Sequence, residues 1–493
     1  MDQINGYPMP PEAAEPAFPT GKRELRFLLA AIVIGVLMAD FVFYSGFYLG
    51  FAVISAASIA AAALYLLRSG CKLTGYSGAL LALSFVICGT FVRSNDGFVK
   101  FVMVCFLLVS ANLGLCLLAG QNRRDPSGVA SLLDAPRTAL TLGVGRMGAA
   151  ARGFNEARKT LGTAGKNRSA VLVGILIAVP VLAILIPLLI SADAAFEGLL
   201  RLLPAVDVSE PVAAVILGLC AACVLYTRAV ALAKAEKIPA TQKQRKGMHP
   251  LTVNTVLGAV CVLYMVYLFS QLAYISGGLS GILPDGFTMA EYARRGFFEM
   301  VWLAAINLAL MTAAVGLTGG KESKLSTRIL CLILGAVTLF LVATACAKMV
   351  MYIGSYGLTR LRVLTTVIMV FLAVTTVVVS LWLFLPKLPY MKVIVLVALV
   401  IGAVTAWADV DTVVAAYNVG AYQAGQLQTV DMEHLCSLSD GAVPYIEALT
   451  KDTNQTIAHR AKEYLQNRGT RIDDFRDWNI AGAVADGIAE KWD

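Results

Sequence analysis

Charged residues are scarce in this chain of 493 residues, where they make up 15% of the sequence against 58% for hydrophobic residues. The mean hydropathy is +0.73. A soluble protein built around one core needs more polar surface than this composition supplies, so the soluble class is excluded. Because charges are costly inside a membrane, the few that lie beside apolar runs are the best indicators of function.

Signatures of catalysis and metal binding are also lacking. The three histidines, His249, His434 and His459, form no metal-ligand spacing with one another. The glycine pairs at 277–278 and 319–320 lack the lysine of a phosphate loop. Nine of the ten cysteines lie in or beside apolar runs, so no disulfide framework is indicated. We expect no metal, no cofactor and no enzymatic activity.

Long apolar runs are what the sequence does contain. A spanning helix needs about 20 apolar residues. This criterion predicts an all-α polytopic membrane protein with about eleven transmembrane helices, near residues 27–43, 48–67, 75–92, 98–118, 170–190, 212–232, 251–275, 297–317, 329–352, 363–385 and 393–408.

The composition changes along the chain and predicts five regions. They are a disordered proline-rich cytoplasmic tail (1–26), four transmembrane helices (27–120), a basic cytoplasmic loop (121–169), seven transmembrane helices (170–408) and a small helical extracytoplasmic domain (409–493). Residues 27–39 also resemble the apolar part of a signal peptide, but no small-residue cleavage site follows.

Basic residues divide unequally between the two faces of the predicted membrane domain. One face collects 25, and the other holds only seven, namely Arg93, Lys100, Arg201, Arg294, Arg295, Arg360 and Arg362. The positive-inside rule therefore predicts a cytoplasmic N-terminus and, with an odd number of spans, an extracytoplasmic C-terminus. An even number would place the C-terminus inside. The same rule accounts for the net charge of +8, so we expect no nucleic-acid partner.

The predicted loop at 121–169 contains an apolar stripe at helical spacing, formed by Leu140, Val144, Met147, Ala151 and Phe154. Basic residues lie off this stripe. The pattern is typical of an amphipathic helix that rests on anionic lipid headgroups. A solvated connector and a docking site for a protein partner are the alternatives.

A group of charges falls near the predicted outer ends of the spans and forms the candidate polar pocket. Its members are Asp40, Glu291, Arg294, Arg295, Glu299, Lys348, Arg360 and Asp409. Asp40 and Lys348 are the most deeply placed, and a charge at such a depth is normally paired or faces water. We hypothesise that Lys348 faces Asp40 or another acid. Inter-helix salt bridges and snorkelling lysines are the structural alternative.

Several segments together resemble a known family. They are Ala39-Asp40, the stretch from Ala290 to Glu299, the stretch from Tyr356 to Arg360, and Tyr417-Asn418. They are similar to a family of bacterial multi-pass membrane proteins known only as a domain of unknown function. The resemblance extends from the first span to Trp478-Asn479 and implies a bacterial cell-membrane location. It supplies no activity, so no catalytic residue can be assigned from it.

The sequence favours a non-enzymatic protein of the lipid bilayer that senses, regulates or scaffolds through its charged outer face. A secondary transporter is the alternative. It would need polar groups near the middle of the membrane, where Asn112 and Asn307 are the candidates. A membrane-embedded enzyme ranks third, because no nucleophile and base can be paired.

Overall fold

The computed structural model describes residues 22–121, 209–234, 248–279, 297–317, 325–472 and 474–492. Within these ranges the chain is helical and contains no strand. Nine of the described helices are long and apolar enough to span a membrane. Each predicted span that falls in the described ranges is a helix, and the fold class is therefore confirmed. The predicted span at 170–190 and the predicted loop at 121–169, apart from Gln121, lie outside the described residues.

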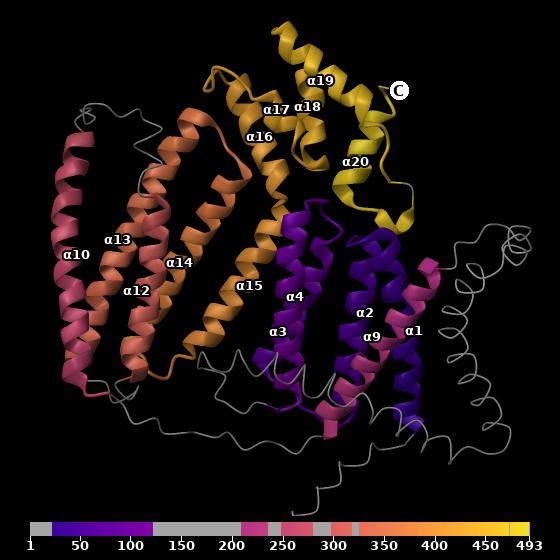
Figure 1. Ribbon diagram of the computed structural model, residues 1–493, viewed down its shortest axis with the longest axis horizontal. Helices are drawn as coiled ribbons and strands as arrows, with labels where there is room; N and C mark the ends of the chain where they lie inside the picture. The colour runs from indigo at the N-terminus through magenta and orange to yellow at the C-terminus, as the bar shows by residue number, and fades with distance from the viewer. Residues whose placement is uncertain are drawn as a thin grey trace, which may run out of the picture.

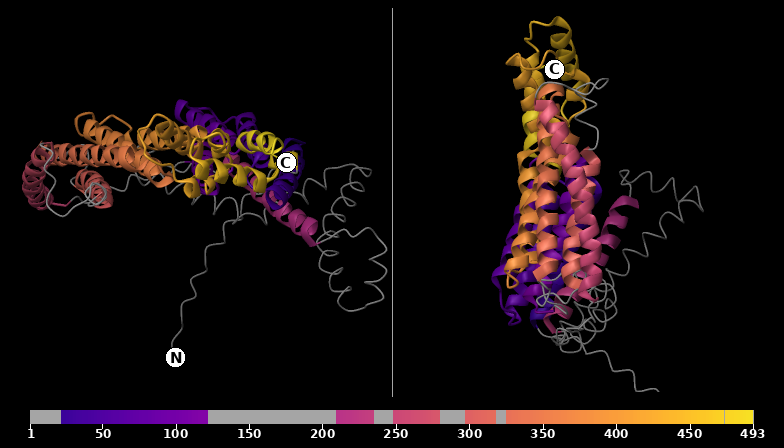
Figure 2. Two further views of the ribbon diagram at one scale, coloured as in Figure 1. Left: turned by 90° about the horizontal axis from the view of Figure 1, so that it is seen from above. Right: turned by 90° about the vertical axis from the view of Figure 1, so that its left-hand side faces the viewer.

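The spans form two bundles that stand side by side (Figures 1 and 2). The first bundle comprises α1 (Lys22–Ser45), α2 (Leu49–Arg68), α3 (Gly75–Thr90), α4 (Gly97–Leu118) and α9 (Ser209–Lys234). The second comprises α10 (Pro250–Leu279), α12 (Phe297–Leu317), α13 (Leu325–Tyr356) and α14 (Arg360–Phe384). Helix α15 (Tyr390–Ala408) lies between them and packs against α3, α4 and α14.

Helix α3 is the exception among the predicted spans, since it has only 16 residues. Its start is fixed by a capping box in which the Thr74 and Ser77 side chains each accept a hydrogen bond from the other residue's backbone N–H. It ends at Thr90, where the chain turns toward α4. A helix of this length is near the lower limit for crossing a bilayer unaided.

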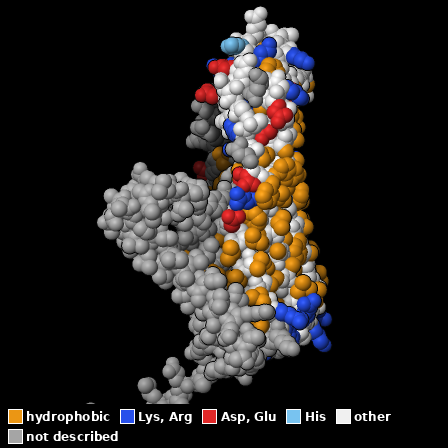
Figure 3. Space-filling model, turned by 90° about the vertical axis from the view of Figure 1, so that its right-hand side faces the viewer, with side chains coloured by type: hydrophobic (Ala, Val, Ile, Leu, Met, Phe, Trp, Pro, Cys, Tyr) orange, Lys and Arg blue, Asp and Glu red, His pale blue; other side chains and the backbone are white. Residues whose placement is uncertain are grey.

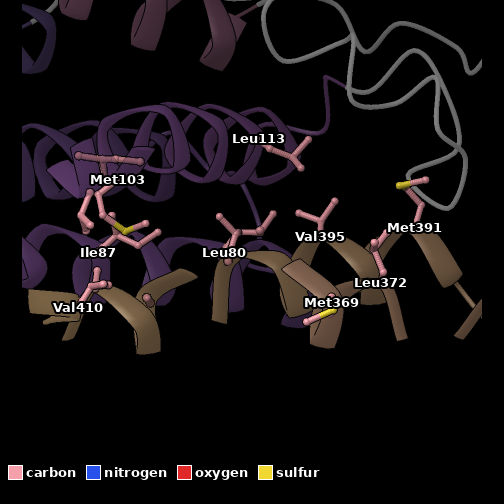
Figure 4. Close-up of a cluster of buried hydrophobic side chains, with 14 of the residues drawn as sticks. Leu80, Ile87, Met103, Leu113, Met369, Leu372, Met391, Val395 and Val410 are labelled. Carbon is pink, nitrogen blue, oxygen red and sulfur yellow. The ribbon is translucent and has the colours of Figure 1, made fainter. Parts of the chain in front are cut away.

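The core between the bundles is apolar. Side chains of α3 and α4 meet side chains of α14, α15 and α16 (Val410–Gln423). The labelled residues in Figure 4 are Leu80, Ile87, Met103, Leu113, Met369, Leu372, Met391, Val395 and Val410. Outward-facing side chains of the same helices are also apolar, such as Phe101 of α4 and Val404 of α15, which are 67% and 63% exposed. A helix that is apolar on every side is the form expected in lipid.

The tail is the helical domain that follows α15. It contains α16 (Val410–Gln423), α17 (Met432–Cys436), η5 (Asp440–Ala442), α18 (Val443–Leu449), α19 (Gln455–Arg468), η6 (Phe475–Asp477) and α20 (Ile480–Ala489). It caps one end of the spans (Figure 1). Arg476 of the tail pairs with Asp40 near the C-terminal end of α1, so the tail lies at the end of the bundle opposite to Lys22.

Small residues allow α1 and α9 to approach closely. A Cβ atom added to Gly218 would lie 2.7 Å from the carbonyl oxygen of Gly35 and 2.7 Å from the Cα of Val36. Without a hydrophobic force between helices in lipid, such close backbone packing is a principal source of association. The contact of α1 with α9 therefore depends on glycine at both positions.

We predict that Gly218→Val lowers the free energy of unfolding by about 1–3 kcal/mol, because the added methyl groups force α1 and α9 apart. The matched control is Gly258→Val in α10, since a Cβ atom there meets nothing within 4 Å. Unfolding of the purified protein by detergent titration provides the measurement. Equal losses in the two variants would show that helix propensity, not packing, is responsible.

Candidate functional site

Charged side chains and Asn95 at the ends of the spans nearest the tail meet it in a cluster that we call the junction network. Its members are Asn95, Asp96, Arg360, Asp411, Asp440, Arg468 and Asp486. Asp96 belongs to the connection of α3 and α4, and Arg360 begins α14, so the network includes both bundles and the tail.

Arg360 holds three helices together. Its guanidinium forms a bidentate ion pair with the carboxylate of Asp411 in α16, and its Nε lies 3.7 Å from Oδ2 of Asp96. Asp411 is fully buried and also accepts a hydrogen bond from the backbone N–H of Ser439 at 2.7 Å. Asp96 caps α4 by accepting hydrogen bonds from the N–H groups of Phe98 and Val99. Bidentate arginine pairs fix orientation as well as adding energy.

Arg468 is the buried centre of the tail. Its side chain has no exposed surface, and it donates to Asp440 at 2.9 Å and to Asp486 at 2.8 Å. The second oxygen of Asp440 accepts a hydrogen bond of 2.6 Å from the Asn95 side chain. A buried guanidinium is stable only when its charge is paired, so these acids fix α19, η5 and α20 against the α3–α4 connection.

The carboxyl group of Asp486 is kept ionised by its hydrogen bonds within the tail. Burial alone would raise the pKa of this carboxyl. The hydrogen bonds from Arg468 and from the backbone N–H groups of Ile472 and Arg471 outweigh that effect and hold the pKa below its usual range. Asp486 therefore stays ionised throughout the physiological pH range.

Backbone hydrogen bonds also join the tail to the spans. The N–H of Ile480 donates to the carbonyl of Val92 at 2.8 Å, and the N–H of Ala481 donates to that of Arg93 at 3.2 Å. Both donors lie in the first turn of α20 and would otherwise lack partners. Arg93 in turn donates to the carbonyl of Trp407 at the end of α15.

Lys100 lies beneath this junction and is 6% exposed. Its Nζ is 3.2 Å from the centre of the Tyr48 ring, a cation–π contact. Among the described residues no hydrogen-bond acceptor reaches this ammonium group. The signal for this position in the sequence is weak, namely a lysine inside the apolar run of the fourth predicted span.

The predicted pocket residues separate into three groups. Asp40, Arg360 and Asp409 lie at the tail end of the spans, where Asp40 pairs with Arg476 at 2.9 Å. Glu299 is exposed on α12 and Lys348 is half-buried on α13, both in the second bundle. Glu291, Arg294 and Arg295 lie outside the described residues.

Asp409 separates α15 from α16. It has a φ of 58°, in the left-handed region, and it is the one non-glycine residue with positive φ in the described part of the chain. Its carboxylate is buried and accepts a hydrogen bond from Thr412 at 2.7 Å. A Cβ atom on Gly441 would overlap this carboxylate, so glycine is required there. Burial, followed by the nearby charge of Asp411, raises the pKa of Asp409, with Thr412 and Arg93 opposing the shift.

Sequence reasoning missed most of the network. Asp440 was expected only as a helix cap, and Asp96, Arg468 and Asp486 carried no signal of their own because their partners are remote in the chain. Among the described residues no group of three or more His, Cys, Asp or Glu side chains could hold a metal. The expectation that the protein uses no metal or cofactor stays a prediction.

We expect Arg468→Met to lower the free energy of unfolding of the tail by about 3–5 kcal/mol, because it removes the ion pair of Asp486 and leaves the buried Asp440 with only the exposed Arg471 at 3.5 Å. Arg460→Met is the matched control, since Arg460 is exposed on the same helix. The rate of proteolysis within residues 440–490 and the unfolding midpoint report the change. Similar behaviour of the two variants would contradict a buried ion-pair centre.

The raised pKa of Asp409 predicts a stabilising substitution. A carboxyl whose pKa in the folded protein exceeds the unfolded value of about 3.9 binds its proton more tightly when the protein is folded. Stability therefore falls as the pH rises from the unfolded pKa through the folded pKa. Asparagine tolerates positive φ and carries no charge to desolvate. Asp409→Asn should therefore unfold at a higher temperature at pH 7, and the difference should shrink toward pH 4. A variant that is less stable at pH 7 would show instead that the ionised form is favoured.

Comparison with known proteins gives one match. The family model described as a domain of unknown function, DUF4153, matches residues 28–449. This range includes Asp40, Arg360 and Asp440 and ends before α19. Neither the curated proteins nor the solved structures contain a match to the chain. Because the model covers most of the sequence, the chain belongs to the DUF4153 family of multi-pass membrane proteins.

Proposed function

We propose that this protein is a non-enzymatic sensing or regulatory protein of the bacterial cell membrane, in which docking of the tail on the spans is the regulated event. The observation that carries this proposal is the position of Arg360 and Asp411. Their ion pair joins the tail to α14 of the second bundle, while Asp96 beside it belongs to the first. Movement of the tail would therefore change the contact between the bundles.

The proposed topology places the N-terminus in the cytoplasm and the tail outside. Its support is the excess of basic residues in the loops at the N-terminal end of α1, together with the position of the tail at the opposite end. Anionic lipid headgroups at the basic loop are proposed as the inner contact. A tail on the outer face would be exposed to solutes, ions or protein partners outside the cell.

The energetic balance of the junction favours a regulated contact. The ion pair of Arg360 with Asp411 joins the spans to the tail. Release of the tail would separate these two groups and expose both to water, so neither would stay buried without a partner. Lys100 differs, because it is buried under the tail with its ammonium on the Tyr48 ring and would become hydrated on release. Docking therefore gains from ion pairs and loses from the desolvation of one lysine, so its free energy is the difference between opposing contributions.

A secondary transporter remains the alternative function. Its midplane candidates are engaged in bonds between helices: Asn307 accepts a hydrogen bond from Tyr264 at 2.9 Å and donates to Thr338 at 3.1 Å. Asn112 accepts a hydrogen bond from Arg228. These contacts favour a packing role for both residues. A cysteine at position 348 that reacts with an impermeant reagent from both sides of the membrane would favour transport.

A tail fixed in its docked position tests the sensing function. Val92→Cys and Ile480→Cys place two thiols at adjacent backbone positions without changing any charge of the junction network. A short bifunctional thiol reagent then joins them in cells that lack the native gene. We expect the level of the transcripts that depend on this gene to stay constant in cells with the joined protein. In cells with either single-cysteine variant, the transcript level should change as it does with the native protein.

Two outcomes would overturn the proposal. A joined tail that leaves the response unchanged would mean that the tail is a static scaffold. A chain truncated after Asp411 that retains the full response would mean that the tail is not the sensing part.

A further inference from the structure

The base of the tail carries an apolar surface that we call the tail-base face, formed by Phe475, Trp478, Ile480 and Val484. Their exposed fractions are 71%, 39%, 37% and 49%. Ile480 and Val484 are four residues apart and share one side of α20. Phe475 and Trp478 flank the short turn that leads into this helix.

The tail-base face lies directly on the outer ends of the spans. Helix η6 packs against α1 and α2, and the Arg476–Asp40 ion pair fixes it at the end of α1. The hydrogen bond from Ile480 to Val92 fixes the start of α20 at the end of α3. The exposed apolar residues of the tail are therefore held next to the lipid-facing surface, not at its far tip.

Exposed aromatic side chains mark the same level on the spans. Phe47 precedes α2, Phe98 lies in the first turn of α4, and Tyr356 and Trp407 lie in the last turns of α13 and α15. Aromatic residues gather where membrane proteins meet the lipid headgroups. In Figure 3 the hydrophobic surface of the spans extends up to the base of the tail, where acidic and basic side chains gather.

The outermost helix of the tail provides the contrast. The exposed positions of α19 are all polar, namely Gln455, Thr456, His459, Arg460, Lys462, Glu463, Gln466 and Asn467. Figure 1 shows α19 at the top of the tail, away from the spans. Water on all sides of the tail would favour polar side chains on α19 and α20 alike, so the apolar surface of α20 indicates different surroundings.

We propose that the tail-base face lies in the outer interfacial layer of the bilayer, so that the tail is bound by lipid as well as by the junction network. The partner is the headgroup and upper acyl region of the surrounding phospholipids. Arg476, which lies between Phe475 and Trp478, is paired with Asp40 and with Asp474, so its charge does not oppose this contact. The inference does not depend on the sensing function, since a static tail could be anchored in the same way.

Nitroxide labels on single cysteines test the proposal in the full chain, with native cysteines replaced. Positions 475 and 484 report the tail-base face, and position 466 on α19 is the matched exposed control. The protein is placed in nanodiscs of phosphatidylethanolamine and phosphatidylglycerol. Relaxation by oxygen, which concentrates in lipid, is compared with relaxation by a water-soluble nickel chelate.

We expect the ratio of oxygen to nickel accessibility at 475 and 484 to exceed that at 466 severalfold. A ratio equal to that at 466 would overturn the proposal by showing that the face is in water. Low accessibility to both reagents would also overturn it, because the face would then be covered by protein. Val484→Asp checks the assignment further, since it should shift a label at 475 toward nickel while the label at 466 stays unchanged.

Discussion

The structure depends on the cost of burying charge where the tail meets the spans. The side chains of Asp411 and Arg468 have no exposed surface, and each is stable only because an opposite charge is within reach. These partners come from segments that are remote in sequence, such as Arg360 with Asp411 and Arg468 with Asp440. Arg468 and Asp440 both belong to the tail, whereas Arg360 and Asp411 join the spans to the tail, so docking supplies the partner of the buried Asp411 carboxylate.

The two bundles share a boundary at helix α15, which leads into the tail. Helix α15 packs between α14 and the α3–α4 pair, then breaks at Asp409 and continues as α16 into the tail. The apolar core shown in Figure 4 stabilises the packing of the spans along their length. The polar contacts fix the position of the tail at the end of the spans. In a family without an assigned activity, this junction is the part of the molecule in which charge, burial and geometry converge.

The sequence predicted the membrane fold well because spans are recognised from local apolar length, and every predicted span within the described residues is a helix. The site was predicted only in part. Asp40, Arg360 and Asp409 were chosen because a charge beside an apolar run is conspicuous by itself. Arg468 lies in polar sequence, where a charge is ordinary until its burial is known. Asp486 lies in an apolar stretch, but that stretch is too short to be recognised as a span. The expectation that Lys348 faces Asp40 or another acid stays a prediction.

Hydrogen exchange at the start of α20 tests the docked tail most directly. The amides of Ile480 and Ala481 lie in the first helical turn, where a free helix offers no acceptor, and here they donate to Val92 and Arg93 of the spans. We predict that both amides of the full-length protein in lipid exchange as slowly as those in the middle of α20. Exchange at the rate of an unstructured peptide, with the rest of α20 protected, would show a folded but undocked tail and contradict the account.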